Sequence, residues 1–265
     1  MECSVVTFGV SVMSIANFFD YFELIAADTP RLKREAYAIR YQVYCEEFGY
    51  EDKAAFQHGL ERDDFDHHAW HFLIRHKATG IFAGTARCVL PYDQFNAKRP
   101  LPAEKHCPTA LNPAVVTAMG LKRGDYAEVS RLAVRRDFRC PQWMDEHLNL
   151  NHQLYSPKPG EAKSFACISA CLYFALVAFF QHQSNLQALI AMMEPALMKL
   201  LQRTGFQVKS AGNLVDYHGR RKPCILRRID LTDSICPCYQ PFVRLVTEEV
   251  ARSLNKQACY ALETA

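Results

Sequence analysis

Hydrophobic residues recur at regular intervals along the chain, and their spacing predicts its first elements. In the segment 29–49 they lie three or four residues apart, which is typical of a helix with one buried face. Thr29 can cap the start of this helix, and Gly49 can end it. Two hydrophobic runs, 70–76 and 81–90, flank the short sequence KATG, and this arrangement indicates an antiparallel hairpin.

Strand and helix patterns alternate in the second half of the chain. The expected elements are a strand at 126–134, a helix at 164–181, a strand at 186–193, a helix at 194–206, a strand at 222–230 and a helix at 241–263. Two long polar connections, 91–125 and 135–163, separate them, and the first has room for one short helix. KATG is too short to hold a crossover helix, so a fully parallel sheet is excluded. The pattern therefore predicts an α/β (α+β) fold with a single mixed, mostly antiparallel central sheet flanked by helices.

The expected division of the chain is a lead-in at 1–23, a main domain at 24–235 and a C-terminal helical extension at 236–265. The lead-in is hydrophobic, but an acidic residue stands where a secretion signal needs basic ones, so we expect a packing arm. The hydrophobic run 164–180 is at the short limit for a membrane span and contains Ser and Tyr. We expect a helix buried against the sheet and allow for peripheral membrane contact; a membrane anchor is the alternative.

Charge and cysteine content narrow the class of protein. The formal net charge is +3, which is too small to indicate a nucleic-acid partner but allows a local basic patch. The 11 cysteines are an odd count, and the pairs Cys167/Cys171 and Cys236/Cys238 lack a matching second pair. We therefore expect reduced, mostly buried thiols in a cytoplasmic protein and no zinc site.

The strand at 126–134 contains an acid and a base among its hydrophobic residues. Glu128 and Arg131 are three positions apart, so in a regular strand their side chains face opposite sides. They can share a site only if a β-bulge lies between them, and we predict one. A bulge would also free a backbone N–H group. The alternative is a buried Glu–Arg ion pair that only holds the sheet together.

Four short motifs resemble the acyl-homoserine-lactone synthases, from about residue 24 to 230. IRYQVYCEEFGYE, at 39–51, is similar to the family's N-terminal signature, DDFD at 63–66 resembles its acidic element, GTARCVL at 84–90 contains its arginine, and EVSRLAV at 128–134 is the most specific match. The resemblance implies catalytic roles for Glu128 and Arg131. It also implies substrate-binding roles for Arg40, Tyr44, Tyr50, Asp63, Asp66 and Arg87.

The resemblance also implies a fold and an activity. The family has the fold of the GNAT acyltransferases and moves a fatty acyl group from acyl carrier protein to an amine, without a metal or redox cofactor. Tyr44 and Tyr50 stand where the lactone synthases carry Phe and Trp, so an amino acid or similar amine is the expected acceptor. This favours the related N-acyl amino acid synthases and exosortase-associated acyltransferases. The alternatives are a lactone synthase that uses S-adenosylmethionine and a non-catalytic acyl-binding regulator.

The residues after this strand bear on the acyl donor. No glycine occurs between Gly124 and Gly160, so the glycine-rich turn that holds a coenzyme A pyrophosphate is absent. Arg135, Arg136 and Arg139 are expected to contact an acidic carrier protein; a solvated basic surface is the alternative.

For each of the remaining candidate site residues, a purely structural role is the alternative to a functional one. Arg40, Asp63, Asp66 and Arg87 form either an acceptor pocket or simple salt bridges. His67, His68 and His71 are close in sequence, but neighbours in a strand point apart, so we expect no metal site. Cys88 lacks the partners of a nucleophile and is expected in the core. The hydrophobic helix at 166–180 either lines an acyl tunnel or packs ordinarily.

Overall fold

The computed structural model describes residues 17–93, 95, 98–139, 148–150, 153–155, 157–231 and 235–263. A central sheet has the strand order β1-β2-β3-β4-β7-β10-β8, and a short strand, β9, pairs with β10. The strands are β1 Phe22–Ala26, β2 Ala69–His76, β3 Phe82–Val89, β4 Tyr126–Val134, β7 Ala188–Met193, β8 Lys209–Ser210, β9 Val215–Asp216 and β10 Arg220–Arg227. Only the β4–β7 pairing is parallel among the described strands. The predicted mixed, mostly antiparallel sheet is confirmed.

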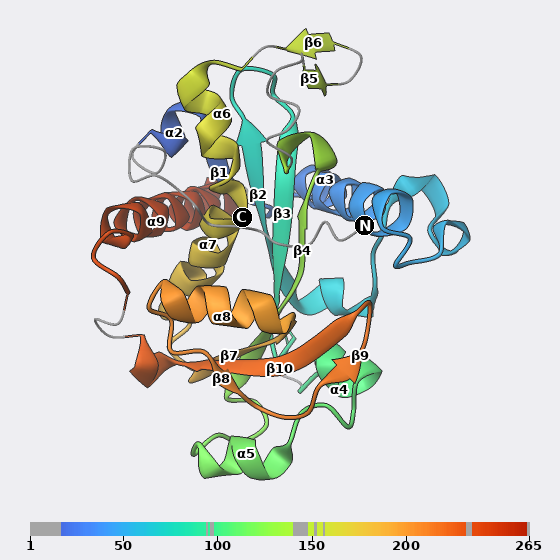
Figure 1. Cartoon of the computed structure of the whole chain (residues 1–265), viewed down its shortest axis with the longest axis vertical. Coiled ribbons are helices and arrows are strands. Elements are labelled where there is room, and N and C mark those ends of the chain that lie inside the picture. Colours follow the sequence, from blue (N-terminus) through green and yellow to red (C-terminus); the bar gives the residue numbers. More distant parts are fainter. Residues whose placement is uncertain are drawn as a thin grey trace.

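Helices cover both faces of this sheet (Figure 1). The helices are α2 Phe18–Tyr21, α3 Pro30–Arg40, α4 Pro102–His106, α5 Pro113–Ala118, α6 Pro159–Phe165, α7 Ile168–His182, α8 Pro195–Arg203 and α9 Gln240–Glu263. A π-helical turn, η1 Tyr41–Glu47, continues α3, and short 3-10 turns lie at Lys53–Ala55, Gln57–Gly59, Asp64–His68, Arg136–Phe138 and Arg228–Asp230. In Figure 1, α7 and α9 lie on one side of strands β1–β4 and α3 lies on the other.

The first predicted helix begins and ends where the sequence indicates. The Thr29 hydroxyl accepts a hydrogen bond from the Leu32 N–H at 3.2 Å, which caps α3. Gly49, just after the π-helical turn, has φ +63°, a left-handed conformation that glycine adopts without steric cost. The hairpin of β2 and β3 is also confirmed, with its tight turn at residues 77–81.

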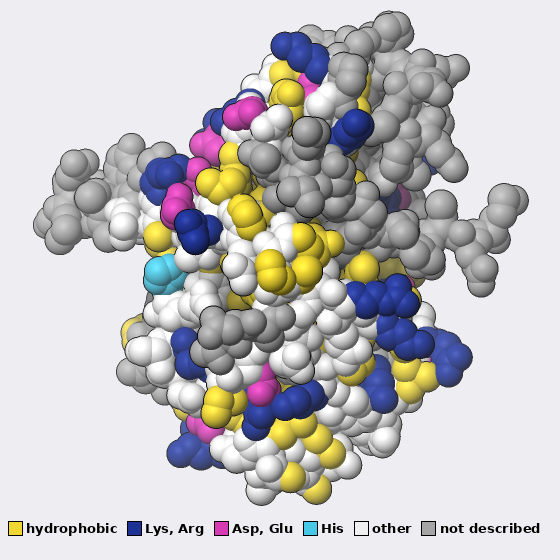
Figure 2. Space-filling model, turned by 60° about the vertical axis from the view of Figure 1, so that its left-hand side comes forward, with side chains coloured by type: hydrophobic (Ala, Val, Ile, Leu, Met, Phe, Trp, Pro, Cys, Tyr) yellow, Lys and Arg dark blue, Asp and Glu magenta, His cyan; other side chains and the backbone are white. Residues whose placement is uncertain are grey.

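The predicted helix at 164–181 is α7 together with the end of α6. Phe174, Phe179 and Phe180 are buried in the main hydrophobic core together with residues of the sheet and of α9. No helix in the described part of the chain combines the length and hydrophobicity needed to cross a membrane. Hydrophobic side chains do reach the surface beside Lys and Arg on the face shown in Figure 2. Peripheral membrane contact stays a prediction.

Several elements differ from the sequence prediction or extend it. Strand β1 lies across the predicted domain boundary at residue 24 and pairs with β2. The connection at 135–163 was expected to be irregular, but it contains a hairpin, β5 Leu148–Leu150 with β6 Gln153–Tyr155, and most of α6. The connection at 91–125 contains two short helices, α4 and α5, where one was expected. Residues 1–16 of the predicted lead-in lie outside the described residues.

Helix α9 packs into the same core as the sheet. Val246 and Val250 are fully buried, and Val243 and Leu254 pack beside them, as the helical spacing predicts. The Ser253 hydroxyl accepts a hydrogen bond from the Ala26 N–H of β1 at 2.9 Å. The predicted C-terminal extension therefore contributes directly to the packing of the edge strand.

Candidate active site

Strand β4 carries the predicted bulge. Arg87 of β3 pairs with Ser130 and Thr85 pairs with Ala133, so two β4 residues, Arg131 and Leu132, lie opposite the single residue between them. Arg131 has φ +51°, a conformation that costs energy for a residue with a side chain. Such strain persists only where the surrounding structure enforces it, and it is common at functional sites.

The bulge changes which face of the sheet each β4 side chain occupies. Before it, alternate residues such as Val129 pack towards α7. After it, Leu132 packs towards α7 in the position that a regular strand would give to Arg131. Arg131 instead faces the same side as Ser130, whose hydroxyl accepts a hydrogen bond from Arg87 at 3.1 Å. Two residues before Ser130, Glu128 shares that side. The shared face predicted for Glu128 and Arg131 is confirmed.

Glu128 and Arg131 nevertheless form no ion pair with each other among the described residues. Glu128 is buried and accepts a hydrogen bond from the Ala103 N–H, in the first turn of α4, at 2.8 Å. Burial raises the pKa of Glu128 to about 8, although the Ala103 hydrogen bond and nearby Arg87 oppose the rise. The purely structural Glu128–Arg131 bridge considered above is therefore not formed.

Arg131 pairs with carboxylates from distant parts of the chain. Its Nη2 lies 2.8 Å from Glu51 Oε1 and 3.2 Å from Glu61 Oε1, and Asp63 is within 3.8 Å. Neither Glu51 nor Glu61 was among the predicted site residues. The signal that could have found them is position, since Glu51 ends the IRYQVYCEEFGYE motif and Glu61 lies two residues before the start of DDFD.

Arg40, Arg87, Asp63 and Asp66 form a buried ion-pair network. Arg40 is fully buried and pairs with Glu61 and, at 2.7 Å, with Asp66. Arg87 is 1% exposed and lies 2.6 Å from Asp63 and 2.8 Å from Asp66. Burial alone would raise the pKa of Asp66, but Arg40 and Arg87 hold it well below its ordinary value. The structure thus brings these four predicted residues together, with Arg131 and Glu61 joining them.

Two buried donors of this network, Arg40 Nη2 and Arg87 Nη2, make no hydrogen bond to any described residue. Arg87 also lowers the pKa of Glu128 electrostatically, so its guanidinium lies near that carboxyl. An unpartnered buried donor such as Arg87 Nη2 is suited to bind a water or a substrate atom.

Aromatic side chains border the bulge. The Tyr44 hydroxyl donates a hydrogen bond to the Leu132 carbonyl at 2.8 Å, and the Arg131 guanidinium lies 5.4 Å from the centre of the Tyr44 ring. Tyr50 lies 6.3 Å from Tyr44 and 5.2 Å from His218, measured between ring centres. Tyr44 is therefore placed to hold the bulge, and Tyr50 and His218 stand at its rim. His218 was not among the predicted site residues.

The histidines and Cys88 do not add a reactive group. His67 is exposed, whereas His71 is fully buried and its Nε2 lies 3.4 Å from Asp66 Oδ1. Burial lowers the pKa of His71 to about 3, so its ring is neutral. No group of three or more potential ligands in the described part of the chain is arranged to hold a metal ion. Burial raises the pKa of Cys88 to about 12, so this thiol is a core side chain, as expected.

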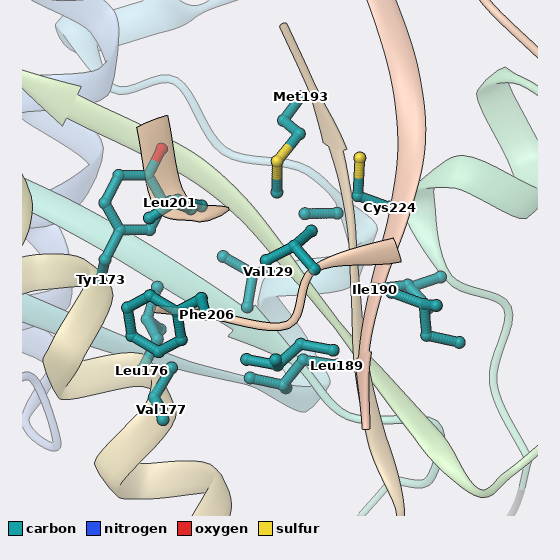
Figure 3. Close-up of a pocket in the computed structure, with 14 residues that line it drawn as sticks. Val129, Tyr173, Leu176, Val177, Leu189, Ile190, Met193, Leu201, Phe206 and Cys224 are labelled. Atoms are coloured by element: carbon teal, nitrogen blue, oxygen red, sulfur yellow. The ribbon is translucent and has the colours of Figure 1, made fainter. Parts of the chain in front are cut away.

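A hydrophobic cavity of about 50 Å³ lies on the opposite side of β4 (Figure 3). Val129 of β4, Tyr173 and Val177 of α7, Met193 of β7 and Phe206 are among its lining residues. Helix α7 thus contributes to the wall of this cavity, and an acyl tunnel along it stays a prediction. The cavity lies where the sheet divides, because the β4–β7 pairing ends at Val129 and Ala191 while β4 continues to Val134.

The comparisons with known proteins agree with this architecture. A search of curated protein sequences found no match. Residues 39–147 match the family model described as the acetyltransferase (GNAT) domain. The chain has the GNAT fold.

Solved structures with this GNAT fold include two kinds of synthase. TofI, in a complex with an inhibitor and MTA, matches with a TM-score of 0.52 and 19% identity over 77% of this chain and 91% of that one. The acyl-homoserine lactone synthase BjaI, with SAM and isopentyl-CoA, matches with a TM-score of 0.54 and 15% identity. The match covers 87% of this chain and 89% of BjaI. FeeM, an N-acyl amino acid synthase from uncultured soil microbes, matches with a TM-score of 0.51 and 16% identity. The match covers 82% of this chain and 96% of FeeM. At these identities the likeness establishes the fold.

The three arginines that follow β4 in the GNAT domain differ in exposure. Arg135 is half-buried and donates a hydrogen bond to the Gln42 side chain. Arg139 pairs with Glu47 and stacks over Phe48, 4.5 Å from the ring centre. Arg136 is exposed. Arg135 and Arg139, both predicted to contact the carrier protein, therefore hold the end of β4 against the π-helical turn.

Proposed function

We propose that the chain is an N-acyltransferase that moves a fatty acyl group from acyl carrier protein to the amine of an amino acid or a similar acceptor. The GNAT fold and the synthase structures support an acyltransferase. The observation that carries the proposal is the arrangement around β4. One face of this strand presents Glu128 and the Arg131 bulge, and the other face borders a hydrophobic cavity at the point where β4 and β7 part.

Each half of this arrangement suits one substrate. The cavity is hydrophobic and borders the division of the sheet, so we place the entry of the acyl chain there. Beyond Val129, β4 has no strand partner on the β7 side among the described residues. Backbone N–H groups in this part of β4 are available to donate to the thioester oxygen as negative charge develops on it.

The chemistry needs a proton acceptor and no covalent enzyme intermediate. The acceptor ammonium loses a proton to the Glu128 carboxylate, directly or through a water held by Arg87 Nη2. The free amine attacks the thioester carbonyl, the carbon–sulfur bond breaks, and the carrier leaves as a thiol after taking up a proton. A carboxyl with a pKa of about 8 is a stronger base than an ordinary glutamate, and this suits proton transfer from an ammonium group.

The ion-pair network bears on the identity of the acceptor. Arg40, Arg87 and Arg131 already pair with protein carboxylates, so the carboxylate of an amino acid would compete with Glu51 for Arg131, which is 14% exposed. The network contains three arginines and four carboxylates, and this excess of negative charge favours a cationic acceptor. A lactone synthase that uses S-adenosylmethionine is therefore the second candidate. A non-catalytic acyl-binding protein is the remaining alternative.

Mass spectrometry of organic extracts from bacteria that express the chain tests the proposal. Cells with the wild-type chain should accumulate an amide-linked fatty acyl compound that is absent with Glu128→Gln. Glu23→Gln is the matched control, because Glu23 is 35% exposed on the edge strand β1, where it pairs with Arg75 of β2, and two strands separate β1 from β4. An acyl lactone would instead establish the second candidate. Equal product from wild type and Glu128→Gln would refute the catalytic role of Glu128.

A further inference from the structure

Two solvent-accessible cysteines lie side by side between β10 and α9. The sulfur atoms of Cys236 and Cys238 are 3.0 Å apart. Cys238 is exposed and Cys236 is half-buried. Six other cysteines are buried, namely Cys45, Cys88, Cys107, Cys167, Cys171 and Cys224. Among the cysteines whose exposure the structure describes, Cys236 and Cys238 are therefore the two that solvent reaches.

The backbone holds the two sulfur atoms on the same side of a turn. The Cys236 N–H donates to the Thr204 carbonyl at 3.0 Å, which anchors the turn to the end of α8. The Tyr239 N–H donates to the Cys236 carbonyl at 2.9 Å and closes the turn just before α9. Pro237, between the cysteines, has a fixed φ. The chain therefore loses little conformational freedom when the two sulfur atoms meet.

The two thiols are not equivalent. The contact between the two sulfur atoms lowers the pKa of Cys236 and raises the pKa of Cys238. Cys236 is thus the better nucleophile of the pair, because the thiolate is the reactive form. Cys238 is the neighbouring thiol that can resolve a mixed disulfide on Cys236.

We propose that Cys236 and Cys238 form a reversible intramolecular disulfide by exchange with a low-molecular-weight disulfide such as oxidised glutathione. The Cys236 thiolate attacks one sulfur of the reagent and releases one equivalent of thiol, leaving a mixed disulfide. Cys238 then loses its proton and attacks the Cys236 sulfur, and a second equivalent of thiol leaves. The two protein thiols are oxidised and the reagent is reduced, so electrons and protons balance.

The turn touches a second, smaller cavity next to the one described above. Thr204, which accepts the Cys236 hydrogen bond, and Tyr239 both line this cavity together with Phe174 of α7. The two cavities share Tyr173, Leu201 and Phe206. Oxidation would therefore fix a turn that forms part of this hydrophobic wall. The proposed disulfide itself stands independently of the transferase activity.

Peptide mapping of the folded, full-length protein tests this disulfide directly. Trypsin should release residues 229–244, a peptide in which Cys236 and Cys238 are the only cysteines, and residues 164–199, which contain the buried Cys167 and Cys171. After oxidised glutathione and alkylation without denaturant, peptide 229–244 should carry no alkyl group and weigh two hydrogen atoms less. Dithiothreitol should restore both alkylations. Peptide 164–199 serves as the internal control, with the same number of thiols, and should not change.

Single variants test the order of attack. Cys238→Ser should accumulate a mixed glutathione disulfide on Cys236, and Cys236→Ser should react more slowly at Cys238. The proposal is overturned if wild-type peptide 229–244 keeps both thiols or gains two glutathione adducts. A disulfide from this peptide to another cysteine would overturn it as well.

Discussion

Glu128 should make the stability of the protein depend on pH in a direction opposite to that of most carboxylates. Its carboxyl stays neutral in the folded protein up to about pH 8, whereas the unfolded chain ionises it above its ordinary pKa of 4.5. Between these values the unfolded state binds fewer protons than the folded state. The free energy of unfolding therefore falls as pH rises through this window, and the loss is complete above pH 8.

The size of the effect follows from the two pKa values. The difference between 4.5 and about 8, multiplied by about 1.36 kcal/mol for each pKa unit, gives about 5 kcal/mol. Glu128→Gln keeps the shape of the side chain and its acceptor for the Ala103 N–H but cannot ionise. Any cost of a poorly paired amide is the same at every pH. The variant should therefore gain stability relative to wild type by about 5 kcal/mol between pH 4.5 and pH 8.5.

Urea unfolding at a series of pH values, followed by far-ultraviolet circular dichroism, measures this difference. Glu23→Gln controls for the general effect of removing a carboxylate, because Glu23 is partly exposed on the edge strand. Its unfolding free energy should follow that of wild type within about 0.5 kcal/mol at every pH. Parallel curves for wild type and Glu128→Gln would refute the reasoning, since they would mean that Glu128 ionises alike in both states. In an acyl-transfer assay the wild-type rate should rise with pH through a pKa near 8.

Four further variants test other parts of the site. Arg40→Met leaves the buried Glu61 and Asp66 without their arginine partner and should lower the unfolding free energy, measured in urea, by about 3–5 kcal/mol. Arg34 is exposed on the same helix, so the control variant Arg34→Met should change the unfolding free energy by less than about 0.5 kcal/mol. Tyr44→Phe removes the hydrogen bond to the Leu132 carbonyl and should cost about 1 kcal/mol in the same experiment, with a larger fall in turnover than in acceptor affinity. Val177→Phe should fill the 50 Å³ cavity and shorten the acyl chain of the product seen by mass spectrometry. Arg136→Glu should reduce transfer from acyl carrier protein at low salt while leaving transfer from an acyl-coenzyme A unchanged.

Local patterns account for most of what the sequence predicts correctly. Helix α3 and hairpin β2–β3 follow from spacing, capping and turn residues that act over a few positions. Strand β1 was missed although Phe22, Leu24 and Ala26 alternate inwards, because it is only five residues long and follows a hydrophobic segment without a clear period. The short strands β8 and β9 were missed as well, since runs of two residues carry no periodic signal.

The site shows the same limit. The charged pair in β4 predicts a bulge because two residues three positions apart can face the same side only if the strand is irregular between them. The partners of Arg131 could not be deduced in this way. Glu51 and Glu61 are 80 and 70 residues away along the chain, and only tertiary packing brings them to the bulge. The same holds for Arg139, whose partner Glu47 is 92 residues away.

The bulge links the packing of the core to the geometry of the site. In a regular strand Leu132 would point into the ion-pair network and Arg131 into the hydrophobic layer against α7. One extra residue reverses both positions, so Leu132 joins the core while Arg131 reaches Glu51 and Glu61. Burial of Leu132 and the ion pairs of Arg131 thus offset the strain at φ +51°. The same irregularity lets one strand present a charged site on one face and a hydrophobic cavity on the other, which is the arrangement that a transfer between an amine and a fatty acyl chain requires.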